Sequence, residues 1–597
     1  MKGLGVCMNI EKKKDKSHFL LYDDFVCKLK LDSRIEFNSE LLEKLIEKSL
    51  IVTVKDNDKA YIYEDDLKFA RDIMHLNYKL LESNNDIGFC GSLLSEIIKI
   101  EEATFLCYDS NISSKYVPVL VRNIVYLFKG DFKKCERREY CIFGVTLITY
   151  NEYIANYIEN ALYRKHKLEN IKSSNFSNSS SYMGSKKNIV GFIIESIWPH
   201  TNDDSIILDI MCGSGAVSNA LAQMGNIYSS DSQLFCRLLA KIQGAGFNRY
   251  LAEETLNSIY ECYMHNFSLL KNEYTKQLEM EKKIFHMDTN EPQKIFEEYE
   301  KYLDMVDLYS STDYTNPSVL NKVIERKKDH RLSPYCLFTC YFANVYFGLE
   351  QCLQIDSIRY AIDNIEDENI REWALGVLVV TISSIASNHA GHFAQPKRVD
   401  VKSIVKINEK RKKSAWLEFS KRIVSIGAES ERYLYNVNII NGPWEEALNE
   451  VVKNHQTDVI VYLDAPYKRD EYSRYYHVLE TAVLYDYPHS ENKGRVRSKT
   501  NGERFRTEFF SKNTNIVAEK LASTIERIMK KSSVCAWSYS NNAAASIPKV
   551  VDMILEKTKC NVYFHAIPHK HTSQRRKIKG EQYFESNIIE YCIIFVK

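Results

Sequence analysis

The chain has 597 residues, of which 45% are hydrophobic and 27% are charged, and its formal net charge is +1. This composition is typical of a globular protein with several domains and excludes a disordered or fibrous chain. The most apolar stretches, 50–54 and 373–385, are shorter than the ~20 residues that cross a bilayer. Because the first residues lack an apolar signal segment, we expect a cytoplasmic protein. The 15 cysteines form no C-x-x-C pair, so we expect reduced core thiols and no metal site.

Residues 1–169 are expected to form an N-terminal α/β domain. Its first predicted elements are, in order, a helix at 40–48, a strand at 50–54, a turn at 55–58, a strand at 60–63 and a helix from Glu64. This order is typical of a winged-helix module, which binds DNA or dimerises, and equally of a small structural α/β cap. The polar segment 170–181, rich in serine and asparagine, predicts a linker.

A strand, a glycine turn and a helix follow the linker. The aliphatic residues 205–208 lead into Asp209-Ile210-Met211-Cys212-Gly213-Ser214-Gly215, and a helical stretch then runs through Ala222. Glycines let the backbone approach a ligand closely, and the helix behind them offers free N–H groups. A second strand, 226–230, ends in Asp231, about 20 residues further on, where an acid commonly holds ribose hydroxyls. This spacing predicts a site for a nucleoside cofactor, with an unliganded tight turn as the alternative.

A long and mainly helical region occupies 246–430. Its predicted helices lie at 254–271, 279–302, 334–352 and 371–387. The loop that follows contains His389 and His392, which either reach DNA or are hydrogen-bonded within a structured loop. A basic stretch from Lys397 to Arg422 then carries ten Lys or Arg against three acids, which makes Lys397 and Arg398 candidate DNA contacts. A solvated helix face is the commoner meaning of such a run.

Two further strands precede a distinctive loop. The first, 431–440, ends in Asn441-Gly442-Pro443-Trp444, and the second, 459–463, ends in Asp464-Ala465-Pro466-Tyr467. An acid and an aromatic ring at the carboxyl end of a buried strand supply a hydrogen-bond acceptor and a stacking surface. A site that binds a flat base requires both. The same residues are also common in ordinary turns.

Aromatic and basic residues are frequent after this loop. The segment Tyr472-Ser473-Arg474-Tyr475-Tyr476-His477 predicts either a wall that closes on an extruded base or a set of packing residues. Two more basic runs lie at 493–506 and 570–579. From these segments we take as candidate DNA contacts Arg474, Tyr476, Arg495, Arg497, Arg575, Arg576 and Lys577.

The order of these motifs resembles a known family. Tyr182-Met183-Gly184-Ser185-Lys186, the glycine turn, Asp231, a long insertion and the Asp464–Tyr467 loop resemble the Dam-like DNA adenine N6-methyltransferases. The resemblance implies a Rossmann-like α/β sheet, divided into 182–245 and 431–597 by a target-recognition insertion at 246–430. It also implies site-specific methyl transfer from S-adenosylmethionine to an adenine that is flipped out of duplex DNA. The protein partners that it implies are a restriction nuclease or the subunits of a defence system, with a solitary methylase as the alternative.

The resemblance assigns roles to particular residues. Tyr182 and Lys186 flank S-adenosylmethionine, and Asp231 holds its ribose. The residues that cradle its methionine part are Asp209, Met211, Cys212, Gly213 and Gly215. In the catalytic loop, Asp464 borders the cofactor and accepts a hydrogen bond from the adenine amine, the Ala465 carbonyl helps to direct that nitrogen, Pro466 stiffens the loop and Tyr467 stacks on the base. The family usually has proline where Ala465 stands, so this loop has more conformational freedom.

Other functions remain open at this point. The same fold could act on adenine in RNA or on N4 of cytosine in DNA. A chain that kept the cofactor pocket but lost catalysis could instead be a DNA-binding regulator.

Overall fold

The computed structural model describes most of the last two thirds of the chain and short segments before it. The described residues are 19–31, 37–47, 53–56, 59–63, 67, 70, 105–107, 116–121, 124–129, 134–142, 145–151 and 186–597, the last range without 203, 223, 390, 456–457, 467–471, 506, 510, 541–542 and 570–587.

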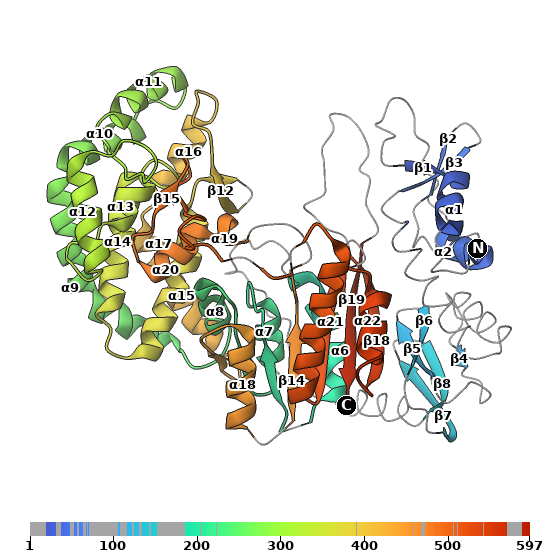
Figure 1. The fold of residues 1–597 in the computed structure, drawn as a ribbon. Coiled ribbons are helices and arrows are strands. Elements are labelled where there is room, and N and C mark those ends of the chain that lie inside the picture. The colour runs from blue at the N-terminus through green and yellow to red at the C-terminus, as the bar shows by residue number, and fades with distance from the viewer. Residues whose placement is uncertain are drawn as a thin grey trace.

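A seven-stranded sheet forms the centre of the molecule (Figure 1). Its strands follow the order β13-β10-β9-β14-β17-β19-β18. The first five are parallel, and β19 is antiparallel to both of its neighbours. The bounds are β9 Ile206–Asp209, β10 Ile227–Ser229, β13 Val437–Ile439, β14 Val459–Leu463, β17 Val534–Ser540, β18 Asn561–His569 and β19 Ile588–Val596. From β9 the chain builds first toward β13 and later toward β17, so the switch point where ligands bind lies between β9 and β14.

Helices cover both faces of this sheet. Every residue of β9 and β14 is buried, as expected for parallel strands that are packed on both sides. On one face, α6 contacts α7 and α7 contacts α8; on the other, α21 contacts both α18 and α22 (Figure 1). The bounds are η2 Lys187–Ile189, α6 Val190–Ile197, η3 Trp198–His200, α7 Ala216–Ala222, α8 Leu234–Lys241, α18 Trp444–Asn454, α21 Thr514–Lys531 and α22 Ile547–Leu555.

The insertion forms a separate lobe of helices beside the sheet (Figure 1). Its elements are α9 Arg249–Glu273, α10 Thr275–Phe285, α11 Pro292–Leu303, α12 Pro317–Lys328, α13 Leu337–Phe342, α14 Leu349–Asp363, α15 Glu368–Ile385, β11 Asn388–His389, β12 His392–Pro396, α16 Ile404–Arg411 and α17 Ala415–Ser430. Helix α15 approaches α8 closely at Gly376, where a Cβ atom would lie 2.8 Å from the Leu238 carbonyl oxygen. This contact ties the lobe to the half of the sheet that contains β9 and β10.

A later segment also packs on the lobe. It contains α19 Tyr472–Tyr475, α20 His477–Leu484, β15 Ser490–Glu491 and β16 Val496–Arg497. The Tyr485 hydroxyl donates to Asp356 of α14 over 2.6 Å, and Arg359 Nε donates to the Ala482 carbonyl over 3.1 Å. Part of the range 431–597, which we expected to form the second part of the methyltransferase core, therefore packs on the insertion.

The N-terminal segments form small sheets. Helix α1 Tyr22–Lys30 and helix α2 Ser39–Glu47 accompany an antiparallel sheet ordered β1-β3-β2. Further along, β5 and β6 form a hairpin that lies beside β18 (Figure 1). The strands are β1 Phe19–Leu21, β2 Thr53–Asp56, β3 Lys59–Tyr63, β4 Phe105–Cys107, β5 Tyr116–Val121, β6 Ile124–Lys129, β7 Lys134–Ile142 and β8 Val145–Asn151. The helix and hairpin expected at 40–63 are present, and β1 adds a third strand to the hairpin.

Several predicted boundaries differ from the structure. The helix expected at 279–302 is two helices, and Pro292 begins the second of them. The helix expected at 334–352 is also divided, because Asn344 has a φ of 60° and the backbone turns before α14. The strand expected at 431–440 shortens to three residues. Among the described helices, none is both long and apolar enough to cross a bilayer.

Candidate active site

A cavity of about 520 Å³ lies at the carboxyl ends of β9 and β14. The glycine turn lines it with Asp209, Met211, Cys212 and Gly213, and the loop after β14 lines it with Asp464, Ala465 and Pro466. These two motifs meet because β9 and β14 are adjacent parallel strands, with Tyr462 opposite Asp209. The structure thus brings together the two motifs that the sequence analysis placed in one site.

Asp209 is buried in the wall of this cavity. One carboxylate oxygen, Oδ2, accepts a hydrogen bond of 2.7 Å from Ser218, whose hydroxyl accepts in turn from Ser229 over 2.9 Å. The other oxygen, Oδ1, has no hydrogen-bond partner among the described residues. Burial raises the pKa of Asp209 to about 7, and the negative charge of Asp464 contributes in the same direction. The cavity wall therefore contains an acceptor that a cationic ligand would stabilise in its charged form.

Asp231 connects the loops that follow β9 and β10. Its Oδ2 accepts from the Gly213 N–H over 3.0 Å, and its Oδ1 accepts from the Gln233 N–H over 2.9 Å. Gly213 has a φ of 50°, a left-handed conformation that glycine adopts without strain. Burial raises the pKa of Asp231. The carboxylate lines the cavity with its orientation fixed by two amides.

Gly215 has a packing role that its motif did not indicate. It lies outside the cavity wall, and a Cβ atom there would be 2.6 Å from the Cα atom of Ala240 in α8. Its φ of 76° also favours glycine. The residue lets the turn approach α8 and does not contact the space where a ligand would lie.

A buried lysine faces the loop that follows β14. Lys186 Nζ lies 3.1 Å from Asp464 Oδ1 and 3.9 Å from Glu590 Oε2. Ala465 is also buried, with 1% of its surface exposed. Glu590 was missed by the sequence analysis, because an acid in a C-terminal strand gives no local sign that it reaches the site.

Several further residues that line the cavity were not among the predicted site residues. Trp444 lines it, and its Nε1 donates to Glu508 over 3.3 Å. The guanidinium of Arg527 lies 5.3 Å from the centre of the Trp444 ring. The lining residues of the segment before α21 are Phe505, Thr507, Glu508 and Phe509. The sequence signal for Trp444 was the Asn441–Trp444 segment, which follows a strand of the sheet.

In the aromatic segment 472–477, some residues line the cavity and others are part of the core. Tyr472 lines the cavity, and Ser473 donates a 2.8 Å hydrogen bond to the Phe505 carbonyl. Tyr476 is only 1% exposed, and its ring lies 5.7 Å from that of Phe235. The prediction that Tyr476 contacts DNA is therefore wrong, because the side chain is part of the core.

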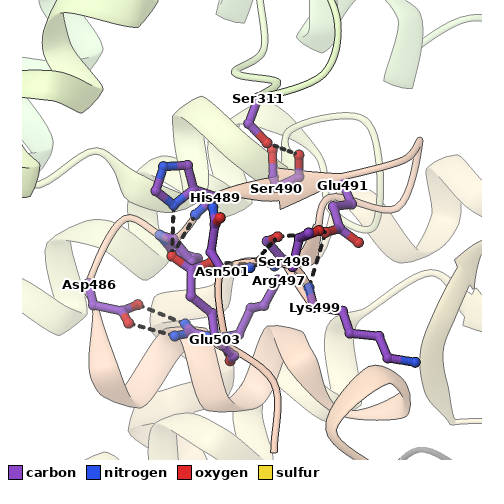
Figure 2. Close-up of polar contacts among 12 residues, drawn as sticks. Ser311, Asp486, His489, Ser490, Glu491, Arg497, Ser498, Lys499, Asn501 and Glu503 are labelled. Carbon is purple, nitrogen blue, oxygen red and sulfur yellow. Dashed lines mark hydrogen bonds and ion pairs between the residues drawn. The ribbon is translucent and has the colours of Figure 1, made fainter.

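Arg497 also differs from its predicted role (Figure 2). Its two terminal nitrogens donate to the two carboxylate oxygens of Asp486 over 2.7 and 2.6 Å, and its Nε donates to the Glu503 carbonyl over 3.1 Å. The side chain is buried. Its donors are used within the loop around β15 and β16, so the prediction that Arg497 binds DNA is wrong. Arg495, two residues earlier, is partly buried.

The remaining candidate DNA contacts vary in exposure. Arg398 is exposed, and Lys397 and Arg474 are partly buried. Five predicted site residues lie outside the described part of the chain: Tyr182, Tyr467, Arg575, Arg576 and Lys577. Their roles stay predictions.

Comparison with known proteins agrees with the geometry of this site. The chain is similar to the Type II methyltransferase M.FokI of Planomicrobium okeanokoites, with 25% identity over 322 residues. The matched region is 53% of this chain and 38% of that protein, so the chain spans well under two thirds of the relative's length. No solved structure matches. The family model of the D12 class N6 adenine-specific DNA methyltransferases matches residues 182–536, more than half of the chain, and confirms the resemblance noted in the sequence. The chain therefore belongs to the D12 class N6 adenine-specific DNA methyltransferase family.

Proposed function

We propose that this protein transfers a methyl group from S-adenosylmethionine to N6 of an adenine in duplex DNA. The observation that carries the proposal is the meeting of the Asp464–Pro466 loop and the glycine turn in one cavity at the switch point of the sheet. Such a switch point is where α/β sheets of this type bind their ligands. Membership of the family supports the same reaction.

The residues of the cavity fit S-adenosylmethionine. Its volume of about 520 Å³ lies within the usual range for cofactor sites. Three of the acids that line it, Asp209, Asp231 and Asp464, lie near the two motifs and suit a ligand that carries an ammonium and a sulfonium group. When bound, the cofactor supplies a methyl group on a positively charged sulfur. Asp209 and the glycine turn would hold its amino-acid part, and Asp231 its ribose.

The catalytic loop would position the target amine. The Asp464 carboxylate and the Ala465 carbonyl accept hydrogen bonds from the N6 amine and hold its nitrogen toward the methyl group. Because this amine is a weak nucleophile, most of the acceleration comes from orientation and from oriented charges. The adenine must leave the duplex first, at a cost of a few kcal/mol. We assign Tyr467 to the stacking of the extruded base.

A group of lysines in the insertion suits contact with the DNA backbone. Lys410 of α16 is partly buried, and its Nζ donates to the Ala386 carbonyl over 3.0 Å. Its pKa is lowered, first by burial and then by the positive charges of Lys413, Lys397 and Lys406. We call these four residues the α16 lysine cluster. Clustered like charges near a surface favour binding of a polyanion.

A series of contacts links the α16 lysine cluster to a residue that lines the cavity. Lys397 directly follows β12, and the ring of His392 in β12 lies 4.9 Å from that of Tyr475 in α19. The first residue of α19, Tyr472, lines the cavity. His477 Nε2 also lies 3.1 Å from the Phe393 carbonyl oxygen of β12. DNA that places an adenine in the cavity would therefore pass close to the cluster.

The remaining parts of the proposal concern the partners of the enzyme. We also propose that α2 and the strands β1, β2 and β3 belong to a winged-helix module that adds DNA or subunit contacts. The name of the relative suggests a restriction-modification system, so we propose a cytoplasmic enzyme with a cognate restriction nuclease.

The proposal is tested by incubating the protein with labelled S-adenosylmethionine and either duplex DNA of varied sequence or RNA. Digestion to nucleosides then identifies the modified base. We expect N6-methyladenine in DNA. Label only in RNA or at N4 of cytosine would favour an alternative substrate, and specific DNA binding without any transfer would favour a regulator.

A further inference from the structure

Three charged side chains meet beside the catalytic loop, each from a different part of the sequence. Lys186 precedes η2, Asp464 follows β14, and Glu590 lies in β19. The ammonium of Lys186 is 3.1 Å from Asp464 and 3.9 Å from Glu590. Only 7% of the Lys186 side chain, 19% of Asp464 and 2% of Glu590 are exposed. The Lys186 ammonium is thus shared between two carboxylates, in a space that is largely closed to water.

The sheet topology explains how Glu590 reaches this place. Because β19 is antiparallel to its neighbours, its first residues lie at the edge where the parallel strands end. Glu590 is paired with Ser540, the last residue of β17. Asp464 follows the last residue of β14, the neighbour of β17 on its other side. Helix α6, which follows Lys186 and η2, contacts β19, so the lysine and Glu590 are brought together by packing.

The position of the shared cation affects what Asp464 can do. In the proposed reaction, positive charge develops on the adenine nitrogen while Asp464 accepts a hydrogen bond from it. A lysine that paired with Asp464 alone would neutralise this charge and occupy an oxygen that the amine needs. Electrostatic effects of this kind are strong where water is excluded.

We propose that Glu590 is a positioning residue that shares the Lys186 ammonium and so keeps the Asp464 carboxylate available to the target amine. This inference rests on the proposed function, because it concerns the methyl-transfer step of the same site. Glu590 acts through Lys186 and has no contact with the substrate in this account. If Glu590 had only a structural role, it would serve simply as a buried counter-ion for Lys186.

The test is a double-mutant cycle with Glu590→Gln and Lys186→Met, measured on duplex DNA. We expect Glu590→Gln to lower kcat by about tenfold or more and to change the dissociation constant for S-adenosylmethionine by less than about twofold. Lys186→Met should also lower kcat, because it leaves two buried carboxylates without their counter-ion and favours the protonated form of Asp464. Because Glu590 acts through the lysine, adding Glu590→Gln to Lys186→Met should cause no further loss. Additive losses in the double variant, or a normal kcat for Glu590→Gln, would overturn the inference.

Two controls separate folding from catalysis. Removing one charge of a buried pair destabilises a protein, whereas removing both is tolerated better. If Glu590→Gln does not fold, the comparison of the double variant with Lys186→Met still decides the matter. The matched control is Glu556→Gln, which removes an exposed acid of the same C-terminal region and should leave kcat unchanged. Wild-type protein that forms no N6-methyladenine would overturn the proposed function itself, whereas active wild type with an equally active Glu590→Gln variant overturns only this inference.

Discussion

Tyr462 of β14 lies opposite Asp209 of β9 in the parallel register of the central sheet. This pairing sets the positions of the two loops relative to each other. Asp464 lies two residues after Tyr462, just beyond the end of β14, whereas the glycine turn begins directly after Asp209. A shift of one residue in either strand would turn its side chains to the opposite face of the sheet. The geometry of the site therefore depends on the aliphatic residues that fix this register.

Replacing Asp464 with asparagine should remove most of the activity. The side chain keeps its size but loses the negative charge that faces the adenine amine, so we expect kcat to fall by about 10²–10³-fold. Binding of S-adenosylmethionine, followed by calorimetry, should weaken only slightly. Asp458→Asn is the matched control, because Asp458 is an exposed acid directly before the same strand. An active Asp464→Asn variant would exclude the assigned role.

Replacing Ala465 with proline should preserve activity. The carbonyl that faces the amine remains, and the ring restricts the unfolded chain, so we expect the free energy of unfolding to rise by about 0.4–1 kcal/mol. Urea denaturation and the rate of methyl transfer measure the two effects. A large loss of activity would mean that the N–H of Ala465 or the freedom of the loop is needed.

Replacing Lys406 with methionine should weaken DNA binding in a salt-dependent way. Loss of one phosphate contact should reduce the slope of log K against log salt concentration by about 0.9. Fluorescence anisotropy with a labelled duplex between low and moderate salt would measure it. The control is Lys412→Met, since Lys412 lies at the end of the same helix but is paired with Glu409. Equal slopes for wild type and Lys406→Met would place the DNA elsewhere.

Replacing Arg497 with methionine should affect folding and not the salt dependence of DNA binding. The change leaves Asp486 without its partner and should lower the free energy of unfolding by about 3 kcal/mol. A second change, Asp486→Asn, should restore part of this loss. Urea denaturation of the three variants provides the measurement, and a variant of normal stability with a reduced salt slope would reinstate the original prediction.

The buried carboxyl of Asp209 predicts a pH dependence of stability. Its pKa is near 3.8 when unfolded and about 7 when folded, so between these values the folded protein holds a proton that the unfolded chain has released. The resulting stabilisation is present at low pH and is lost as the pH rises through 7, by up to about 1.4 kcal/mol per pH unit. Asp209→Asn should lack this slope in the ligand-free protein. Denaturation between pH 5 and 8 would show parallel curves if the carboxyl were ionised throughout.

The local motifs could be predicted because short stretches of sequence determine them. The aliphatic run before Asp464 and the strand–turn–helix pattern around Gly213 each specify a loop at the end of a strand. The prediction that these two motifs lie in one site came from the resemblance to a family of known fold. Helix breaks were harder to predict. The turn at Asn344 depends on a left-handed backbone conformation, which the local sequence does not require.

The contributions from distant segments could not be predicted in the same way. Glu590 reaches the site only because β19 runs antiparallel, and Phe505 only because a segment returning from the lobe crosses the cavity. Sequence also gives no direct measure of burial. Arg497 and Tyr476 belonged to basic and aromatic runs that suggested DNA contact, yet tertiary packing uses both side chains inside the protein.

The insertion also has a consequence for the way the chain folds. The edge strand β13 pairs with β10, and Ser230 donates to the Gly442 carbonyl although the two residues are 212 positions apart. Contacts of such long range form slowly, while helices such as α9 and α14 form from nearby residues. Hydrogen exchange during refolding should thus protect the helical lobe before β13. Until that strand docks, β10 would present an open edge to solvent, and this nascent half of the enzyme would be the stage most exposed to aggregation and most dependent on chaperones.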